Sequence, residues 1–149
     1  VTGRVLALAN TSGKVAGSAF TVIGCDVLIN GEVVATTGAD GVFTIPSLAA
    51  GTYTATLSYA YGYDRDIQIT VADTDVDLGT YGMVVCNFKK DAAINGTDFN
   101  VYKRCTGKSK SDSTYNSACD FNHDGAVNGT DYNIYKAFSG KMLSAEIYN

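Results

Sequence analysis

Short runs of alternating apolar and polar residues fill the first half of the chain. Tyr53–Tyr59 and Ile67–Val71 place apolar side chains at every second position, which gives a strand one buried and one hydrated face. Asn30 and Gly31 separate two further apolar runs, and this pair favours a hairpin because a type I′ turn needs positive φ at both positions. Residues 1–82 are therefore predicted to form an all-β sandwich of two sheets.

The hydrophobic spacing becomes helical in the last third of the chain. Aromatic and apolar residues recur three apart over Asn95–Cys105 and again over Asn128–Phe138, as in a helix with one packed face. Gly107 and Gly140 follow these segments, and glycine commonly ends a helix. The expected fold class is two domains, an all-β sandwich over residues 1–82 and a small all-α unit over residues 83–149. A short apolar connector should keep them in contact.

An internal repeat underlies the two helical segments. Eleven of the nineteen residues in Cys86–Arg104 recur in register in Cys119–Ala137, at an offset of 33. The repeats are expected to span residues 86–107 and 119–140, each as an oxygen-rich loop followed by one helix. Two copies of such a small unit usually share a core.

The second loop has the composition of a calcium-binding loop. Oxygen-bearing side chains occupy its positions 1, 3, 5, 9 and 12, and Gly125 occupies position 6, where the chain must turn sharply. Ca²⁺ takes roughly 6–8 oxygen ligands, among them a backbone carbonyl at position 7 of such a loop. The expected ligands are Asp120, Asn122, Asp124, Ala126, Asn128 and Asp131. The ion would act on folding rather than on chemistry, because so small a unit buries little apolar surface.

The first loop departs from this pattern. Lys89 places an ammonium group at position 3, and Ala92 lacks the conformational freedom of glycine at position 6. We expect calcium in the second loop and weak binding or none in the first, where Lys89 is an alternative built-in cation. The candidate ligands of a second site are Asn87, Asp91, Ala93, Asn95 and Asp98.

Composition and charge narrow the classes of function. The chain has 149 residues, a formal net charge of −4 and no basic run, so no nucleic-acid-binding surface is expected. No apolar stretch reaches the roughly 18 residues of a membrane span. The sequence begins at Val1 without a signal peptide, and we expect it to be part of a longer protein.

The four cysteines do not form a zinc-binding pattern, because they include no CxxC pair and the chain has one histidine. Cys105 and Cys119 close a short loop between the repeats and are the candidate disulfide. A Cys25–Cys86 pair is less favoured, and burial as free thiols is the alternative.

Turn motifs in the first half resemble a known group of sandwiches. Gly3-Arg4-Val5, Asp40–Phe43 and Gly51-Thr52-Tyr53 resemble the carboxypeptidase-regulatory-like, prealbumin/Ig-like sandwich and the collagen-adhesin B repeats. The resemblance implies a spacer or stabiliser attached to another module, without peptidase activity.

The second half, from Val84 to Asn149, resembles the dockerin of cellulosomes. Each loop–helix unit lacks the entering helix of a full EF-hand, and the run Asn95–Lys103 recurs as Asn128–Lys136. The resemblance implies calcium-dependent binding of a cohesin domain on a scaffoldin or anchoring protein. It also implies an extracellular, secreted or surface-attached complex that degrades polysaccharides. A sandwich directly before a dockerin is similar to the X module of X-dockerin pairs, which would stabilise a dockerin that is monomeric before docking.

In the dockerin family, cohesin contacts come from the end of each loop and the outer face of its helix. The matching positions here are Gly96, Thr97, Asn100, Lys103, Arg104, Gly129, Thr130, Asn133 and Lys136. Because the two sets are nearly the same, a partner is hypothesised to bind in either of two orientations related by a 180° turn. Arg104 opposite Ala137 breaks this symmetry.

Three other classes compete with this interpretation. An enzyme is disfavoured because no nucleophile–base arrangement is recognisable and His123 sits at a loop position that faces water. A calcium sensor would need full helix–loop–helix hands and a Met-rich groove. A calcium-stabilised cell-surface adhesin or pilin-like module, cross-linked through Lys14 with Glu32 assisting, is the remaining alternative.

Overall fold

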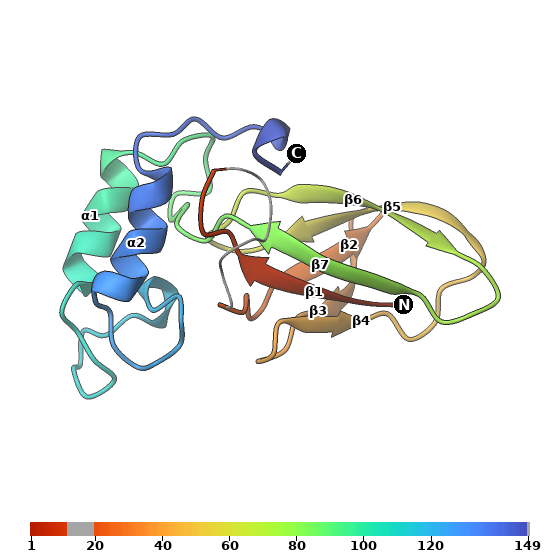
Figure 1. The fold of residues 1–149 in the computed structure, drawn as a ribbon, viewed down its shortest axis with the longest axis horizontal. Helices are drawn as coiled ribbons and strands as arrows, with labels where there is room; N and C mark the ends of the chain where they lie inside the picture. Colours follow the sequence, from red (N-terminus) through yellow and green to blue (C-terminus); the bar gives the residue numbers. More distant parts are fainter. Residues whose placement is uncertain (12–19, 149) are drawn as a thin grey trace.

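A computed structural model describes residues 1–11 and 20–148. The described chain is mostly β (Figure 1). Its strands are β1 (Thr2–Ala7), β2 (Asp26–Ile29), β3 (Glu32–Thr36), β4 (Val42–Thr44), β5 (Gly51–Ser58), β6 (Arg65–Val71) and β7 (Asp77–Met83). Two α-helices follow, α1 (Gly96–Cys105) and α2 (Gly129–Phe138), with short 3₁₀ turns at Ser117–Cys119 and Ala145–Tyr148. Lys14 lies outside the described residues.

Two sheets form the sandwich. One has the strand order β4-β1-β7, with β1 and β7 parallel, and the other is the antiparallel sheet β3-β2-β5-β6. The predicted alternation is confirmed, because Ala55 and Leu57 of β5 and Ile69 of β6 are fully buried. The predicted hairpin is confirmed too, with φ of 53° at Asn30 and 80° at Gly31 between β2 and β3.

Both helices begin and end where the sequence predicts. Asn95 and Asn128 are their N-caps, and each forms a capping box with the aspartate three residues later. Gly107 and Gly140 follow the helices with φ of 76°, a conformation that glycine adopts without strain. The helices lie beside each other at one end of the sandwich (Figure 1).

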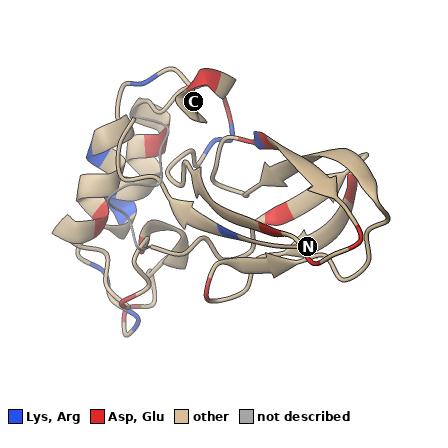
Figure 2. Ribbon diagram, turned by 45° about the vertical axis from the view of Figure 1, so that its right-hand side comes forward, with Lys and Arg blue, Asp and Glu red and all other residues tan. Residues whose placement is uncertain are grey.

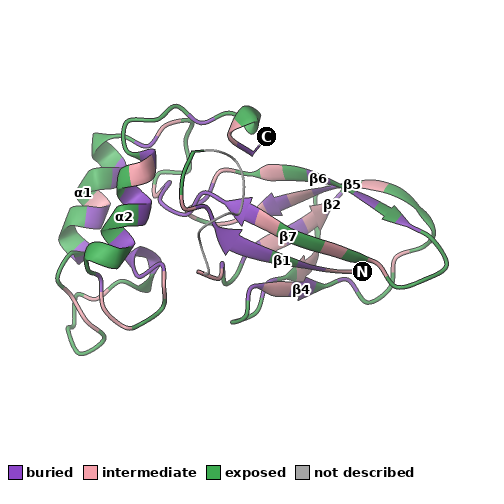
Figure 3. Ribbon diagram, in the orientation of Figure 1, coloured by how far each residue is buried: buried purple, intermediate pink, exposed green. Residues whose placement is uncertain are grey.

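The expected fold class of two domains, the second all-α, is wrong. The described residues form a mostly β structure with only two ten-residue α-helices. One hydrophobic core runs from Val5 in β1 to Phe138 in α2 (Figure 3). The connector from Met83 to Cys86 is buried throughout and joins the two halves of this core. Physically, ten-residue helices bury too little surface for an independent domain, so their apolar faces pack on the end of the sandwich. The boundary after residue 82 stays a prediction.

The end of the chain returns to the sandwich. Tyr148 is buried, its hydroxyl donates to the Tyr63 carbonyl, and its ring lies 4.9 Å from the Arg65 guanidinium carbon. Arg65 also donates to the Gly82 carbonyl at 2.9 Å. The loop–helix repeats are therefore attached to the sandwich both before and after their helices.

Candidate functional site

The two repeats are related by an approximate two-fold axis. In repeat one, Ala93 pairs in a β-bridge with Met142, beyond α2; in repeat two, Ala126 pairs with Ser109, beyond α1. Both partners differ by 33 residues, which is the offset of the sequence repeat. Each loop is thus closed against the segment that follows the other helix, and neither repeat is complete alone.

Aromatic residues at matching positions form the contact between the repeats. The rings of Phe88 and Phe121 stack with centroids 6.4 Å apart, and those of Tyr102 and Tyr135 stack at 5.1 Å. Tyr61 of the sandwich contacts Phe88 at 5.9 Å. The aromatic cluster therefore continues from the repeats into the sandwich.

Loop two, residues 120–131, wraps around two buried carboxylates. Asp120 and Asp131 are 1% and 0% exposed. The Asp131 carboxylate accepts hydrogen bonds from the backbone N–H of Phe121 at 2.7 Å and of Asn128 at 2.9 Å. The Asp120 carboxylate accepts from the Gly125 N–H at 2.8 Å and from the Tyr115 hydroxyl at 2.5 Å.

The rest of loop two turns as a calcium loop requires. His123 at position 4 has φ of 59°, and Gly125 at position 6 has φ of 92°. A Cβ atom at Gly125 would also lie 3.2 Å from the Lys110 side chain, so this position needs glycine for two reasons. Asp124 is exposed and accepts from the Asn122 side-chain amide at 3.0 Å and the Ala126 N–H at 2.9 Å.

The predicted ligands of loop two fit a divalent cation. Burial raises the pKa of the Asp131 carboxyl, the backbone N–H donors lower it, and the charge on Asp120 raises it. A bound Ca²⁺ would offset both the burial and the repulsion between the two carboxylates. Among residues 1–11 and 20–148, no three His, Cys, Asp or Glu side chains converge as a metal cluster. A calcium loop takes half its ligands from amides and backbone carbonyls, so acidic side chains need not cluster so closely.

Loop one, residues 87–98, differs in its details. Asp98 is fully buried and accepts from the N–H groups of Lys89 and Asn95, as Asp131 does in loop two. Lys90 at position 4 has φ of 55°, which matches His123. Lys89 is exposed, and Lys90 rather than Lys89 forms the contacts with neighbouring acceptors.

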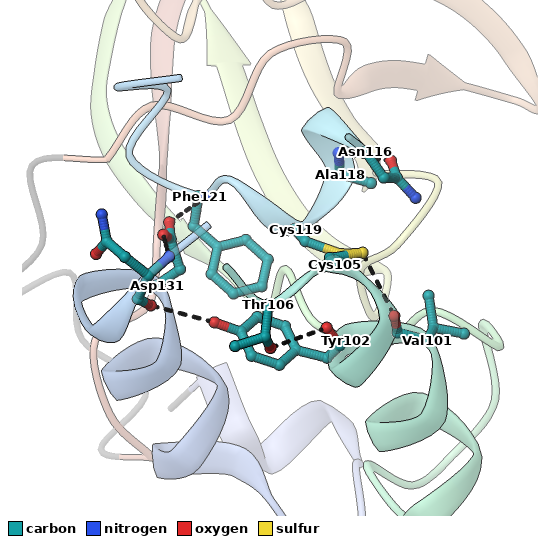
Figure 4. Close-up of a disulfide and its surroundings, with 10 residues drawn as sticks. Val101, Tyr102, Cys105, Thr106, Asn116, Ala118, Cys119, Phe121 and Asp131 are labelled. Atoms are coloured by element: carbon teal, nitrogen blue, oxygen red, sulfur yellow. Dashed lines mark hydrogen bonds between the residues drawn. A yellow bond between two sulfur atoms is a disulfide. The ribbon is translucent and has the colours of Figure 1, made fainter. Parts of the chain in front are cut away.

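A disulfide joins the repeats. Cys105 at the end of α1 is bonded to Cys119, one residue before Asp120, with the Cα atoms 6.3 Å apart (Figure 4). Cys25 and Cys86 are buried free thiols. Burial raises the pKa of the Cys25 thiol to about 12, with the neighbouring Asp26 charge adding to the effect. The bridge fixes the start of loop two to the end of the first helix.

The structure places all nine predicted partner-binding residues at the surface. They occupy the loop ends and outer faces of α1 and α2. Sequence reasoning missed two exposed aromatic residues among them, Phe99 (39% exposed) and Tyr132 (43% exposed). These residues are 33 positions apart, and the repeat was the available signal. Helical spacing alone could not show that their rings are exposed while Tyr102 and Tyr135 are buried.

Charge on this part of the molecule is mixed. Basic and acidic residues are interspersed in the view of Figure 2. Lys103 and Arg104 lie in the last turn of α1 and Lys136 in the last turn of α2, where a positive charge favours the helix dipole. No helix among the described residues is long and apolar enough to cross a membrane.

Comparison with known proteins identifies the repeats. Residues 88–138 match the dockerin type I domain family. These residues form a dockerin. Type I dockerin domains are generally calcium-binding. Among curated proteins, none matches this chain.

The whole chain, sandwich and dockerin together, is similar to chains in two crystal structures of type II cohesin–X-dockerin complexes from Acetivibrio cellulolyticus. One contains a C-terminal interface mutant (Coh3ScaB-XDoc_M2ScaA; TM-score 0.67) and the other an N-terminal interface mutant (Coh3ScaB-XDoc_M1ScaA; TM-score 0.65). Each is 28% identical and covers 95% of both chains. The first half of this chain is therefore an X-module-like sandwich.

Proposed function

We propose that this chain is a non-catalytic assembly module whose dockerin binds a cohesin domain and so builds or anchors a cellulosome. The observation that carries the proposal is the pair of matching exposed surfaces on α1 and α2, within a domain of the dockerin type I family. The similar structures are cohesin complexes of an X module and a dockerin together.

The proposed contact surface combines backbone access, polar groups and aromatic area. Gly96 and Gly129 begin the helices with open space where a Cβ atom would stand, so a partner can approach the backbone closely. The hydroxyl groups and ammonium groups of the nine predicted residues supply a polar rim. Phe99 and Tyr132 add apolar area of the kind that dominates binding at protein interfaces.

Calcium in this proposal fixes the shape of loop two. Asp120, Asn122, Asp124, Ala126, Asn128 and Asp131 would hold it. The ion would supply positive charge between buried carboxylates, and the loop leads directly into the first turn of α2, where Gly129 and Thr130 lie. The geometry that a partner contacts thus depends on the loop.

The proposed location is outside a bacterial cell, in a secreted or surface-attached complex. The Cys105–Cys119 bridge supports it, because disulfides persist in oxidising compartments. The X-module-like sandwich would stabilise the dockerin through their common core. Removing residues 1–80 is expected to weaken cohesin binding or solubility, because it exposes the apolar residues around Met83.

The test is calorimetric titration of the chain against a panel of type I and type II cohesins, with calcium and with EDTA. Binding to at least one cohesin in calcium, and its loss or marked weakening in EDTA, is the expected result. Absence of binding across the panel, or catalytic turnover in a screen of glycans and esters, would contradict the proposal.

A further inference from the structure

Loop one of the dockerin is bonded directly to a turn of the sandwich. The backbone N–H of Asn87 donates to the Tyr61 carbonyl at 2.8 Å, and its side-chain amide donates to the Gly62 carbonyl at 3.2 Å. Both atoms of this contact at Asn87 are buried, since the residue is 1% exposed. The segment 58–64, between β5 and β6, therefore serves as a docking turn for loop one.

Lys90 completes this attachment. Its ammonium group donates to the Asp64 carboxylate at 2.5 Å, to the Tyr59 carbonyl at 2.6 Å and to the Ser58 hydroxyl at 3.3 Å. All three acceptors belong to the docking turn, and the Lys90–Asp64 contact is a salt bridge. Both side chains are partly exposed, so the pair is screened by water and acts together with the Asn87 bonds rather than alone.

The attachment removes the first calcium ligand from loop one. Asn87 occupies position 1, and its side-chain nitrogen donates to Gly62 and, at 2.7 Å, to the Asp91 carbonyl, while its oxygen accepts from the Asp91 N–H. At the matching position of loop two, both carboxylate oxygens of Asp120 accept hydrogen bonds. An amide nitrogen is a donor only and cannot ligate a cation.

Two further positions of loop one disagree with a calcium site. Lys89 at position 3 carries a positive charge and no oxygen. Ala92 at position 6 does not adopt the positive φ that Gly125 adopts in loop two, so the chain does not turn there as a calcium loop must. Loop one therefore keeps two carboxylates, Asp91 and Asp98, with a cationic residue beside each.

We propose that loop one takes no calcium and that the sandwich, through the docking turn, holds it in its closed form instead. The chain then binds a single calcium ion, in loop two. This inference rests on the proposed calcium site of loop two for the ion count only. The two repeats consequently depend on different supports: chelation loosens loop two, and loop one stays closed as long as Lys90 and Asn87 contact the sandwich.

Native mass spectrometry of the full chain, stripped of metal and titrated with CaCl₂, tests the ion count. One ion is expected for the unchanged chain, one for Asp98→Asn in loop one, and none for the matched Asp131→Asn in loop two. Two ions in the unchanged chain, or loss of an ion in Asp98→Asn, would overturn the inference. No ion in any variant would contradict the calcium site of loop two and would support the absence of an ion from loop one.

Hydrogen exchange of residues 87–95 tests the sandwich support independently of calcium in loop two. Lys90→Met and Asp64→Asn are expected to speed exchange there at least tenfold, and added calcium is expected to leave this rate unchanged in all proteins. Asp66→Asn is the matched control, because Asp66 lines the same cleft and accepts from Thr56, without a contact to loop one. Calcium protection of residues 87–95, or unchanged exchange in Lys90→Met, would overturn the inference.

Discussion

Tyr102 of α1 and Tyr135 of α2 stack on each other and cross-link the two repeats in a reciprocal way. Their ring planes are inclined by 15°. The Tyr102 hydroxyl donates to the carbonyl of Asn128, which caps α2, and the Tyr135 hydroxyl donates to the carbonyl of Asn95, which caps α1, at 3.4 Å in both cases. Each helix therefore stabilises the start of the other, and with it the end of the other calcium-type loop.

This symmetry predicts equal effects for matched tyrosine variants. Tyr102→Phe and Tyr135→Phe each remove one long hydrogen bond, so each should lower the free energy of unfolding by about 0.5–1 kcal/mol. Either Tyr→Ala change should cost about 3–5 kcal/mol, because the rings are buried. Urea unfolding followed by circular dichroism measures both. A strong effect from one Tyr→Phe change and none from the other would show that the two-fold relation is not energetic.

The calcium site predicts a stabilisation that one loop carries and the other does not. At about 100 times its dissociation constant, calcium should add about 2.7 kcal/mol to the stability of the unchanged chain. Asp124→Ala should remove most of this gain while leaving stability in EDTA nearly unchanged, because Asp124 is exposed. Asp91→Ala is the matched control, since its carboxylate accepts from the Ala93 N–H as Asp124 accepts from Ala126. Thermal melts with calcium and with EDTA give the comparison.

The two similar helix faces predict redundancy in cohesin binding. Changing Thr97 and Lys103 to alanine should leave affinity nearly intact, because a partner can turn by 180° and use α2. Changing Thr130 and Lys136 as well should abolish binding. Calorimetry on a cohesin that binds the unchanged chain measures both proteins. Strong loss from the first pair alone would exclude two equivalent orientations, and Arg104 opposite Ala137 would then account for the preference.

The exposed aromatic residues predict a stronger effect than the polar rim. Phe99→Ala combined with Tyr132→Ala should lower cohesin affinity at least tenfold, or about 1.4 kcal/mol. Val33→Ala is a suitable control, since Val33 is an exposed apolar residue of β3 in the sandwich. Thermal melts should accompany the titrations, because both rings also contact the buried tyrosines. Unchanged affinity in the double variant would place these rings outside the interface.

The disulfide predicts a reducible part of the stability. Cys105→Ser combined with Cys119→Ser should lower the free energy of unfolding by about 3 kcal/mol, the size expected for closing a loop of this length. The unchanged chain in a reducing agent should lose a similar amount, and the double variant should not respond to the reducing agent. Equal stability of all four samples would mean that the bridge contributes nothing to folding.

Much of the local structure could be predicted from the sequence. The alternation over Tyr53–Tyr59 and Ile67–Val71 located β5 and β6, and the Asn30-Gly31 pair located a hairpin. The repeated Asn-Gly-Thr-Asp run located both helix starts, because an N-cap and its capping box depend on residues only three apart. The positions of the candidate ligands follow from the same short spacing.

The error in fold class has a different origin. Periodicity distinguished strands from helices correctly, but it contains no information about which apolar faces pack together. The single core depends on contacts between residues far apart, such as Tyr148 with Tyr63 and Phe88 with Tyr61. Ten-residue helices cannot satisfy their apolar faces alone, and that requirement is met only in three dimensions.

By itself the sequence determined the strands, the two helices, their caps and the repeated oxygen-rich loops, since each of these depends on neighbours within a few residues. The tertiary structure alone decided that Lys90 rather than Lys89 meets an acidic partner and that Asn87 turns its amide into the sandwich. It also decided that Phe99 and Tyr132 remain exposed while Tyr102 and Tyr135 are buried. Those outcomes depend on the docking of one half of the chain against the other, because side chains are buried and hydrogen bonds formed according to which surfaces meet.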